Sequence, residues 1–276
     1  MRGSYALLLT HCFLRGLSVG VISQPAEVVT QSDIAADLRR LGLGPGDAAE
    51  VHSSLRSLGW VEGGADALVS ALMAVVGPAG AIVMSAYRVS PPLPLTEDDV
   101  ARGIAWKVRI FPPGGSERTG IGVVADTFSG RPDVVCGTGL HRVCAWGHEA
   151  ERHSHGHGHL LAVDGWVLLI GVGIDRCSSM HLAEDAVPVP DDIVRRFTLP
   201  DDVARHYPPD QWAVGYGQDG PDPWMKVWNA GLRRGIVRQG QVGNARCSLF
   251  RARAMVSIYE GFRRDDPYGL YEVSPG

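Results

Sequence analysis

The chain has 276 residues, and its 26 lysines and arginines against 30 aspartates and glutamates give a formal net charge of −4. A chain of this length forms one large or two small domains and buries enough surface to fold without disulfides or metals. The mildly acidic balance argues against nucleic acid as the main partner, because phosphate binding requires a basic surface. No run of about 18 apolar residues occurs, so the sequence predicts no membrane-spanning helix.

The cysteines and the N-terminus both favour a cytoplasmic protein. The five cysteines are odd in number, scattered and without a CxxC motif. Neither a secreted disulfide framework nor a zinc ribbon has this pattern, so a reducing cytoplasm is the simplest location for the protein. Residues 1–23 contain short apolar runs like those of a secretory signal, but His11 and Arg15 interrupt them. We therefore expect a disordered extension over 1–23 and a single domain over 24–276.

From residue 30 onward the sequence alternates between helical and strand patterns. Thr30 and Asp33 have the spacing of a capping box, and Ile34, Leu38 and Leu41 recur behind them at helical spacing. The predicted elements of this half are a helix over 30–41, a strand over 48–52, a helix over 63–76, a strand over 81–87 and a long proline-rich loop over 90–116.

The second half continues the alternation. The apolar run over 166–171 is typical of a strand buried on both faces. The other predicted elements are a helix over 119–128, a turn over 173–176, a helix over 178–186 and a closing helix over 251–262. Alternating helices and strands with short turns predict an α/β protein in which helices flank a layered, mixed sheet.

The first candidate site lies where the strand over 166–171 ends and the next helix begins, because sites of open α/β sheets lie at the carboxyl ends of strands. If Ser178 caps the helix, His181 falls in its first turn, where the helix dipole disfavours the imidazolium and keeps the ring neutral. Glu184, three residues later, is placed to orient that ring or to pair with substrate. A capped helix whose histidine is only hydrogen-bonded fits the spacing equally well.

The second candidate is a serine-rich turn after the strand over 48–52, followed by a glycine pair before a helix. The residues concerned are His52, Ser53, Ser54, Leu55, Gly63 and Gly64. Free backbone N–H groups and hydroxyls at such a place can hold a phosphate, although a helix cap is the commoner use of such a turn. The only lysines, Lys107 and Lys226, do not form a Walker motif, which excludes a P-loop nucleotidase.

Three other patterns carry weaker signals. Residues 120–125 match a dinucleotide fingerprint, but no hydrophobic strand precedes them, which argues against a nucleotide site. The histidine tract (residues 153–159, four alternating histidines) would chelate a metal if extended, yet its glycines favour a solvated loop with adventitious metal binding. Cys177 and His181 are spaced as a thiolate–imidazole pair that takes up an acyl group, although a free cysteine is more often a small buried residue.

Taken together and in order, these segments resemble the aminoglycoside 3-N-acetyltransferases of the antibiotic N-acetyltransferase family. The resemblance runs from about residue 30 to the C-terminus and rests on segments 51–59, 63–64, 82–87, 119–128, 145–147, 168–184 and 240–245. The block over 168–184 is the most specific, because a Gly-Val-Gly turn, a hydroxyl residue and a His-x-Ala-Glu motif follow one another in it. Ser178 stands there in place of the family's usual threonine.

The resemblance implies the family's own α/β fold, unrelated to the GNAT acetyltransferases, and an acetyl-CoA-dependent enzyme of antibiotic resistance. It implies transfer of an acetyl group to the 3-amino group of 2-deoxystreptamine aminoglycosides, with no metal required. By motif position, His181 is the general base and Glu184 the carboxylate that orients it or contacts substrate. The residues that fall where the family holds coenzyme A are His52, Ser53, Ser54, Leu55, Gly63, Gly64 and Ser178.

The acceptor side is less well defined. Because aminoglycosides carry several positive charges, we expect Asp126 and Asp185 to line the cleft, and Tyr87 to stack on or hydrogen-bond to a sugar. Residues 136–139 replace the Arg-Ser-x-His-Pro motif of many relatives, and the stretch over 147–161 is short, so the range of drugs is open. A homodimer, an acyl-CoA-dependent enzyme acting on another amine, and a histidine-rich metal-binding protein are also left open.

Overall fold

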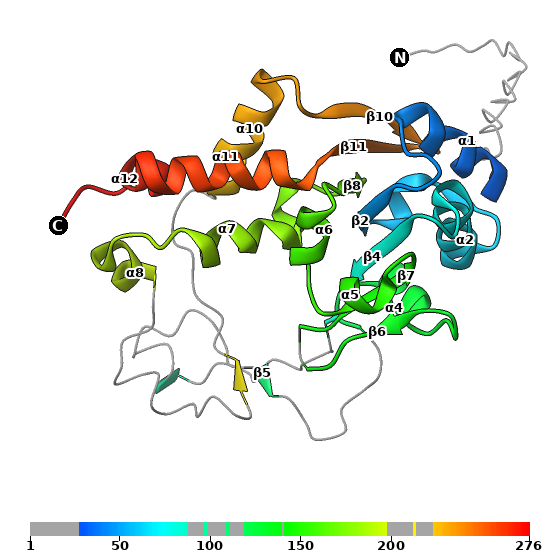
Figure 1. Ribbon diagram of the computed structural model, residues 1–276, viewed down its shortest axis with the longest axis horizontal. Helices are drawn as coiled ribbons and strands as arrows, with labels where there is room; N and C mark the ends of the chain where they lie inside the picture. The colour runs from blue at the N-terminus through cyan, green and yellow to red at the C-terminus, as the bar shows by residue number, and fades with distance from the viewer. Residues whose placement is uncertain are drawn as a thin grey trace, which may run out of the picture.

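The computed structural model describes residues 28–87, 97–98, 109–110, 119–139, 141–197, 212–213 and 223–276 (Figure 1). The expected extension over 1–23 lies outside the described residues, as does most of the expected loop over 90–116. None of the helices in the described ranges combines the length and the apolar content that crossing a membrane requires.

A seven-stranded mixed sheet forms the centre of the molecule, in the strand order β10-β11-β8-β2-β4-β7-β6. Its strands are β2 (Ala48–Ser53), β4 (Ala81–Ser85), β6 (Val135–Cys136), β7 (Val143–Gly147), β8 (Trp166–Ile170), β10 (Arg238–Val242) and β11 (Ala245–Arg251). The three central strands β8, β2 and β4 run parallel, and the pairings on either side of them are antiparallel. The mixed sheet expected from the sequence is confirmed.

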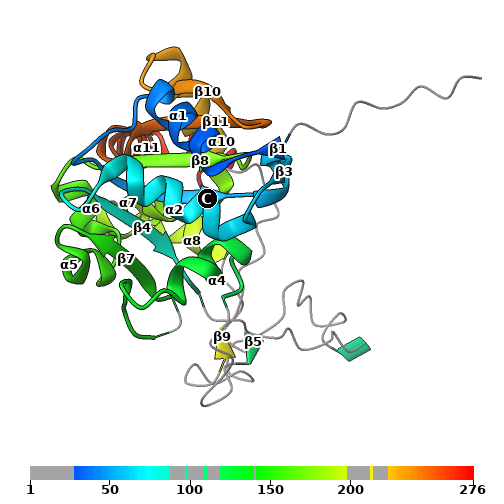
Figure 2. The ribbon, with the colours of Figure 1, turned by 90° about the vertical axis from the view of Figure 1, so that its right-hand side faces the viewer.

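Helices cover both faces of this sheet (Figures 1 and 2). One face packs against α1 (Gln31–Leu41), α2 (Gly64–Val76) and α4 (Val123–Ser129). The other packs against α6 (Gly158–Ala162), α7 (His181–Ala186), α10 (Pro223–Arg233) and α11 (Ala252–Asp265). Successive residues of β8 enter the two cores in turn: Leu168 and Ile170 join the first, and Val167 and Leu169 join the second. The prediction of a strand buried on both faces is confirmed.

Smaller elements complete the described fold. They are the paired strands β1 (Val28–Val29) and β3 (Trp60–Val61), the paired strands β5 (Arg109–Ile110) and β9 (Trp212–Ala213), the helices α5 (Ala150–Ser154), α8 (Asp191–Phe197) and α12 (Pro267–Tyr271), and the 3-10 turns η1 (Leu55–Leu58), η2 (Ile174–Arg176) and η3 (Ser178–Met180).

The ends of α1 follow the sequence prediction closely. Oγ1 of Thr30 accepts the backbone N–H of Asp33 at 3.2 Å, and Oδ2 of Asp33 accepts the N–H of Thr30 at 2.9 Å, which completes the capping box. Gly42 ends the helix with φ 110°, a left-handed conformation that glycine adopts without a steric cost. Local side-chain chemistry therefore fixes both ends of this helix.

The helix predicted over 119–128 is wrong at its start. The helix α4 begins only at Val123, because Gly122 before it has φ 119° and ψ 170°, outside the helical region. Thr119 instead places its backbone N–H on Oδ1 of Asp126 at 3.0 Å. The preceding residues thus form a turn that the Asp126 carboxylate holds in place.

The histidine tract is neither the solvated loop expected from its glycines nor the extended segment considered for metal binding. It spans two short helices, α5 and α6, which end and begin near Gly156 at φ 132°. The left-handed conformation of Gly156 permits a sharp turn, which brings both helices onto the sheet. As a result His153 and His157 are buried. The expectation fails because burial of the histidines, which sequence spacing does not reveal, decides the structure.

The structure contains one disulfide that the cysteine pattern did not predict. Cys136 and Cys144 form a disulfide between the antiparallel strands β6 and β7, in which they stand directly opposite each other. Two further cysteines, Cys177 and Cys247, are free and buried. The pairing depends on the register of two strands, which the cysteine spacing alone does not specify.

Candidate active site

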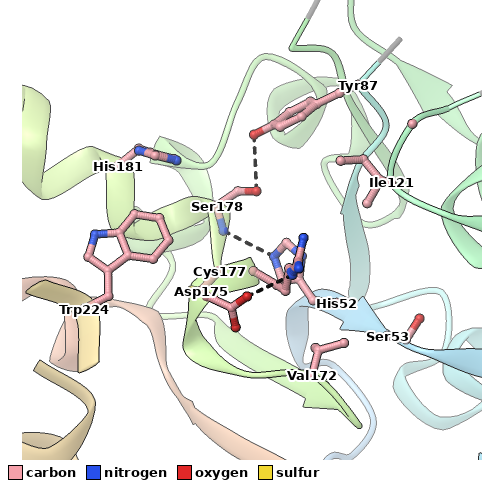
Figure 3. A pocket seen from close by; sticks show the side chains of 12 residues that line it. His52, Ser53, Tyr87, Ile121, Val172, Asp175, Cys177, Ser178, His181 and Trp224 are labelled. Atoms are coloured by element: carbon pink, nitrogen blue, oxygen red, sulfur yellow. Dashed lines mark hydrogen bonds and ion pairs between the residues drawn. The ribbon is translucent and has the colours of Figure 1, made fainter. Parts of the chain in front are cut away.

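The carboxyl ends of the parallel strands open into a pocket of about 410 Å³ (Figure 3). The strand β2 contributes His52 and Ser53, and Tyr87 follows β4. The chain that leaves β8 contributes Ser178 and His181, which Figure 3 shows on the other side of the pocket from Ser53. The remaining lining residues are Gly120, Ile121, Val172, Asp175, Arg176, Cys177 and Trp224.

The imidazole of His181 is held by the carboxylate of Glu184, one turn later on α7. Nδ1 of His181 lies 2.7 Å from Oε2 of Glu184. The other oxygen, Oε1, accepts the indole N–H of Trp224 at 3.2 Å and the hydroxyl of Tyr259 at 3.0 Å. Because an ionised carboxylate only accepts hydrogen bonds, the proton is on Nδ1, and Nε2 of the neutral ring is an acceptor. The carboxylate is therefore placed to orient the ring.

The electrostatics of His181 differ from those expected at a helix start. The hydrogen bond to Glu184 raises the pKa of His181, against the opposing effect of burial. Ser178 does not cap α7, because its hydroxyl accepts hydrogen bonds from Ser85 and Tyr87 and the turn η3 leads into the helix. The expected lowering of the His181 pKa by the dipole is wrong, since a carboxylate at 2.7 Å outweighs the partial charge of a six-residue helix.

A second carboxylate, Glu50, lies completely buried beneath the pocket. Alternation along β2 puts Glu50 and His52 on the same face, where Oε1 of Glu50 lies 2.6 Å from Nε2 of His52. The same oxygen accepts the backbone N–H of Ser179 at 3.2 Å. Burial raises the pKa of Glu50, but His157, His52 and Ser179 outweigh it and bring the pKa to about 2. Glu50 is therefore an anion that ties β2 to η3.

A hydrogen-bonded chain of three side chains, His157, Ser85 and Ser178, leads from Glu50 to the pocket. Nδ1 of His157 lies 3.5 Å from Oε2 of Glu50, and its Nε2 lies 3.1 Å from Oγ of Ser85. The hydroxyl of Ser85 donates to Oγ of Ser178 at 2.8 Å. The hydroxyl of Tyr87 donates to the same atom at 3.2 Å, as Figure 3 shows. Ser178 is thus the point at which this buried chain reaches the pocket.

The structure brings part of the predicted coenzyme set to the pocket. Three of its residues line the pocket: His52, Ser53 and Ser178. The other four are not among the described lining residues: Ser54, Leu55, Gly63 and Gly64. The turn η1 begins directly after Ser54, whose backbone N–H bonds to β8, and the glycine pair begins α2.

The predicted acceptor residues are divided in the same way. Tyr87 lines the pocket, and its ring lies 4.9 Å from that of His141. Asp126 and Asp185 are not among the lining residues in the described part of the chain. The carboxylate of Asp126 holds the turn at Thr119, as described above, and Asp185 is exposed on α7, where its charge raises the pKa of His181.

The environment of Cys177 does not favour the thiolate mechanism. Its side chain is fully buried, and burial raises the pKa of the thiol well above its ordinary value, with the charge of Glu50 adding to the effect. A reactive cysteine instead lies in an electropositive, partly exposed place. The structure therefore corrects the interpretation of Cys177 and His181 as a thiolate–imidazole pair.

The histidine tract does not form the chelating face considered from the sequence. The rings of His153 and His159 lie 4.5 Å apart, while His157 turns toward Glu50 and Ser85. Across the ranges that the structure describes, no three His, Cys, Asp or Glu side chains are arranged to hold a metal ion.

Sequence reasoning missed three buried polar residues of this site, Glu50, Ser85 and His157. One signal was available: an acidic residue in the apolar strand over 48–52, two positions before a histidine, must share a buried face with it. Ser85 and His157 give no such signal, because their partners are far away in sequence. Trp224, which packs edge-on against His181 with ring centres 4.9 Å apart, also lies far from it in the chain.

A pocket at the ends of parallel strands, with a carboxylate-oriented imidazole in its wall, defines an α/β enzyme equipped to move a proton. Residues 51–262 match the sequence profile of the aminoglycoside 3-N-acetyltransferases. The chain belongs to this family and is an acyltransferase, which confirms the resemblance drawn from the motifs.

Individual relatives agree with the assignment. The chain is 31% identical to aminoglycoside N(3)-acetyltransferase III of Serratia marcescens over 83% of its own length and 95% of that protein. It is similar in structure to the YokD protein of Bacillus subtilis, with a TM-score of 0.66 and 26% identity, covering 87% of this chain and 96% of that one. The complex of AAC-IIIb with CoASH has the same fold, with a TM-score of 0.65, 22% identity, and coverage of 91% and 100%. The expected fold is confirmed.

Proposed function

We propose that this protein transfers an acetyl group from acetyl-CoA to the 3-amino group of 2-deoxystreptamine aminoglycosides, with His181 as the general base. The observation that carries the proposal is the 2.7 Å contact between His181 and Glu184 at the wall of the pocket. It leaves Nε2 of the neutral ring free to accept a proton from an amine. The family supports the reaction, and the solved complex of a relative with CoASH supports the coenzyme.

The reaction is a direct transfer that balances without another reactant. The neutral amine nitrogen attacks the carbonyl carbon of the thioester while Nε2 of His181 accepts one N–H proton. The tetrahedral intermediate then collapses, the C–S bond breaks, and the sulfur leaves with the electron pair and takes the proton from His181. A thiol pKa of about 8.5 makes this sulfur a good leaving group, so the step that most needs catalysis is deprotonation of the amine.

The coenzyme assignment draws on the strand ends. His52, Ser53 and Ser178 line the pocket, and Ser54, Leu55, Gly63 and Gly64 follow β2 toward the start of α2. Hydroxyl and backbone N–H groups at such a place suit the amides and phosphates of coenzyme A. Arg176, which lines the same pocket beside Asp175, adds a positive charge that suits a phosphate.

The acceptor assignment uses the other wall. Tyr87 and Trp224 offer aromatic surface to a sugar ring, and the hydroxyl oxygen of Tyr87 adds a hydrogen-bond acceptor. Asp185 and Asp126 supply negative charge near the site for a polycationic drug, at longer range than the sequence predicts, because neither lines the pocket in the described part of the chain. Glu184 is already occupied by three donors, so we assign it to orienting His181.

Thiol release from acetyl-CoA tests the proposal, with gentamicin, kanamycin and apramycin as acceptors. We expect turnover with at least one of them, and NMR of the product to show acetylation at the 3-amino group. His181→Ala should lower kcat by about 10²–10⁴-fold, the usual contribution of a general base, while acetyl-CoA still binds. His155→Ala, in which an exposed histidine is removed, is the matched control and should retain full activity.

Two results would contradict the proposal. Retained turnover in His181→Ala would exclude this residue as the base. Thiol release with other amines but with none of the aminoglycosides would instead favour an N-acyltransferase of different acceptor specificity.

We also propose that the protein works in the cytoplasm, because it consumes acetyl-CoA, a metabolite of that compartment. The Cys136–Cys144 disulfide argues in the opposite direction. Because the two cysteines stand directly opposite each other on paired strands, the strands hold them together without the bond, so the fold does not depend on an oxidising compartment. Fractionation of cells that produce the protein should recover it with the cytoplasmic enzymes.

A further inference from the structure

The histidine tract places one of its members beneath the pocket. His157, at the start of α6, is 9% exposed, and its Nε2 lies 3.1 Å from the hydroxyl oxygen of Ser85. The mechanism above does not use this residue. Its position between a buried anion and a hydroxyl that leads to the pocket calls for an explanation.

The directions of the hydrogen bonds fix what Ser178 offers to a ligand. Ser178 accepts from the hydroxyl of Ser85 at 2.8 Å and from that of Tyr87 at 3.2 Å. A hydroxyl has two acceptor lone pairs and one proton. Both lone pairs of Ser178 are in use, so its proton is left for a partner in the pocket that this residue lines.

Counting protons and lone pairs in the same way identifies His157 as the first donor of the hydrogen-bonded chain. The proton of Ser85 is used on Ser178, so the oxygen of Ser85 must accept from Nε2–H of His157. Burial lowers the pKa of His157, which favours the neutral ring, and Nε2 then carries its only proton. Nδ1 of His157 lies 3.5 Å from Oε2 of Glu50, a distance that allows electrostatic attraction to the carboxylate but is too long for a good hydrogen bond.

A purely structural role does not account for this arrangement. Nδ1 of His157 and Oε2 of Glu50 are buried and have no hydrogen-bond partner within the described part of the chain. Unpartnered buried polar atoms are costly and rare. His153 also has a buried Nδ1 without a partner in the described part of the chain, so the feature that sets His157 apart is its Nε2, which lies 3.1 Å from the Ser85 hydroxyl that leads to Ser178.

We propose that His157 and Ser85 are positioning residues that hold the Ser178 hydroxyl as a hydrogen-bond donor to the carbonyl oxygen of the thioester. The inference rests on the proposed acetyl transfer and adds the group that stabilises its developing negative charge. The bond strengthens as the oxygen becomes an oxyanion, so it stabilises the transition state more than the bound substrate. No proton moves along the chain.

Kinetic measurements on four single variants test whether the hydrogen-bonded chain positions the Ser178 hydroxyl. Ser178→Ala should lower kcat by about 10²–10³-fold, as loss of one oxyanion donor does elsewhere, with the KM for acetyl-CoA changed less than about twofold. Ser85→Ala and His157→Ala should each lower kcat by about tenfold, because they release the hydroxyl without removing it. His157→Gln, whose amide keeps an N–H near the position of Nε2, should recover most of that loss.

Non-additivity separates a shared chain from independent damage. The double variant Ser85→Ala/His157→Ala should be no slower than either single variant, since both interrupt the same connection. The matched control is His153→Ala, which removes another buried histidine of the histidine tract that does not contact the chain. It should keep the wild-type kcat even if its thermal stability falls.

Infrared spectroscopy gives a readout that needs no acceptor amine. Acetyl-CoA labelled with ¹³C at the carbonyl should show a lower carbonyl stretch in wild type and His157→Gln than in Ser178→Ala or His157→Ala. If the band shift is observed but no aminoglycoside is turned over, the proposed function is contradicted while the positioning role of His157 and Ser85 is still supported. A wild-type kcat and band in His157→Ala, or a Gln variant no better than Ala, would overturn the inference.

Discussion

At the scale of single residues, the site depends on which atoms carry protons. Glu184 accepts from Nδ1 of His181 at 2.7 Å and raises the pKa of that ring. In the proposed mechanism the imidazole of His181 must be neutral to accept a proton, so we expect the rate to rise with pH through the pKa of His181. The carboxylate therefore has two opposing effects: it orients Nε2 toward the pocket, and it moves the acidic limb of the profile to higher pH.

Glu184→Gln separates these two effects. The amide keeps the shape and one acceptor but loses the charge, so the pKa of His181 should fall and the acidic limb of kcat/KM should move to lower pH. The plateau should fall by about tenfold or more, because the ring is held less firmly. Tyr259→Phe, which removes another donor to the same carboxylate and keeps its charge, is the control and should leave the limb in place.

An unchanged pH profile in Glu184→Gln would contradict this role for the carboxylate.

The His181–Glu184 pair was predictable from sequence, because residues three apart share a helix face. The partners of Ser178 were not, since its predicted capping role assumes an α-helix where the chain forms the turn η3. Competition between a nearby cap and distant hydroxyls is settled by tertiary packing.

At the scale of elements, those with strong local signals were predictable. The capping box of α1, the apolar run of β8 and the glycine after α2 each act within a few residues. The hairpin of β10 and β11 was not predicted, because four of the five residues of β10 are exposed on a sheet edge and show no alternation. The short helices α5 and α6 were not predicted either, because they are stabilised by burial against the sheet and not by a local sequence signal.

The capping box of α1 gives a prediction at this scale. Thr30→Ala removes the hydroxyl that accepts the N–H of Asp33, and should lower the free energy of unfolding by about 1 kcal/mol. Urea denaturation measures the change. Gln31→Ala, an exposed substitution in the same turn, should lower it by less than about 0.5 kcal/mol. Equal stability of Thr30→Ala and wild type would show that packing alone fixes this helix start.

At the scale of the whole molecule, the strand order assembles the site. Parallel pairing of β8, β2 and β4 brings together chain segments near residues 52, 85 and 178, which are far apart in sequence. Glu50 connects the first and the last of these segments directly, because it bonds to His52 on its own strand and to Ser179 on η3. It reaches the segment near residue 85 through His157, which lies close to both Glu50 and Ser85. The family was predictable from the order of the motifs, whereas this connection depends on the strand order of the sheet.

The charge of Glu50 should make the fold sensitive to acid. Its pKa is about 2 in the folded protein and 4.5 in an exposed chain, so its ionisation stabilises the fold above about pH 4.5 and the contribution is lost as the pH falls toward 2. The lowered pKa of His157 acts in the same direction at higher pH, because the unfolded chain takes up that proton first.

Glu50→Gln tests this dependence. At pH 7 the variant should lose about 3 kcal/mol of unfolding free energy, the equivalent of the pKa difference, and at pH 3.5 the gap to wild type should narrow by about 1–2 kcal/mol. Urea denaturation at the two pH values measures both. Glu62→Gln, at an exposed carboxylate, should show no such narrowing. A gap that stays constant between pH 7 and 3.5 would mean that Glu50 contributes through shape and hydrogen bonding rather than through its charge.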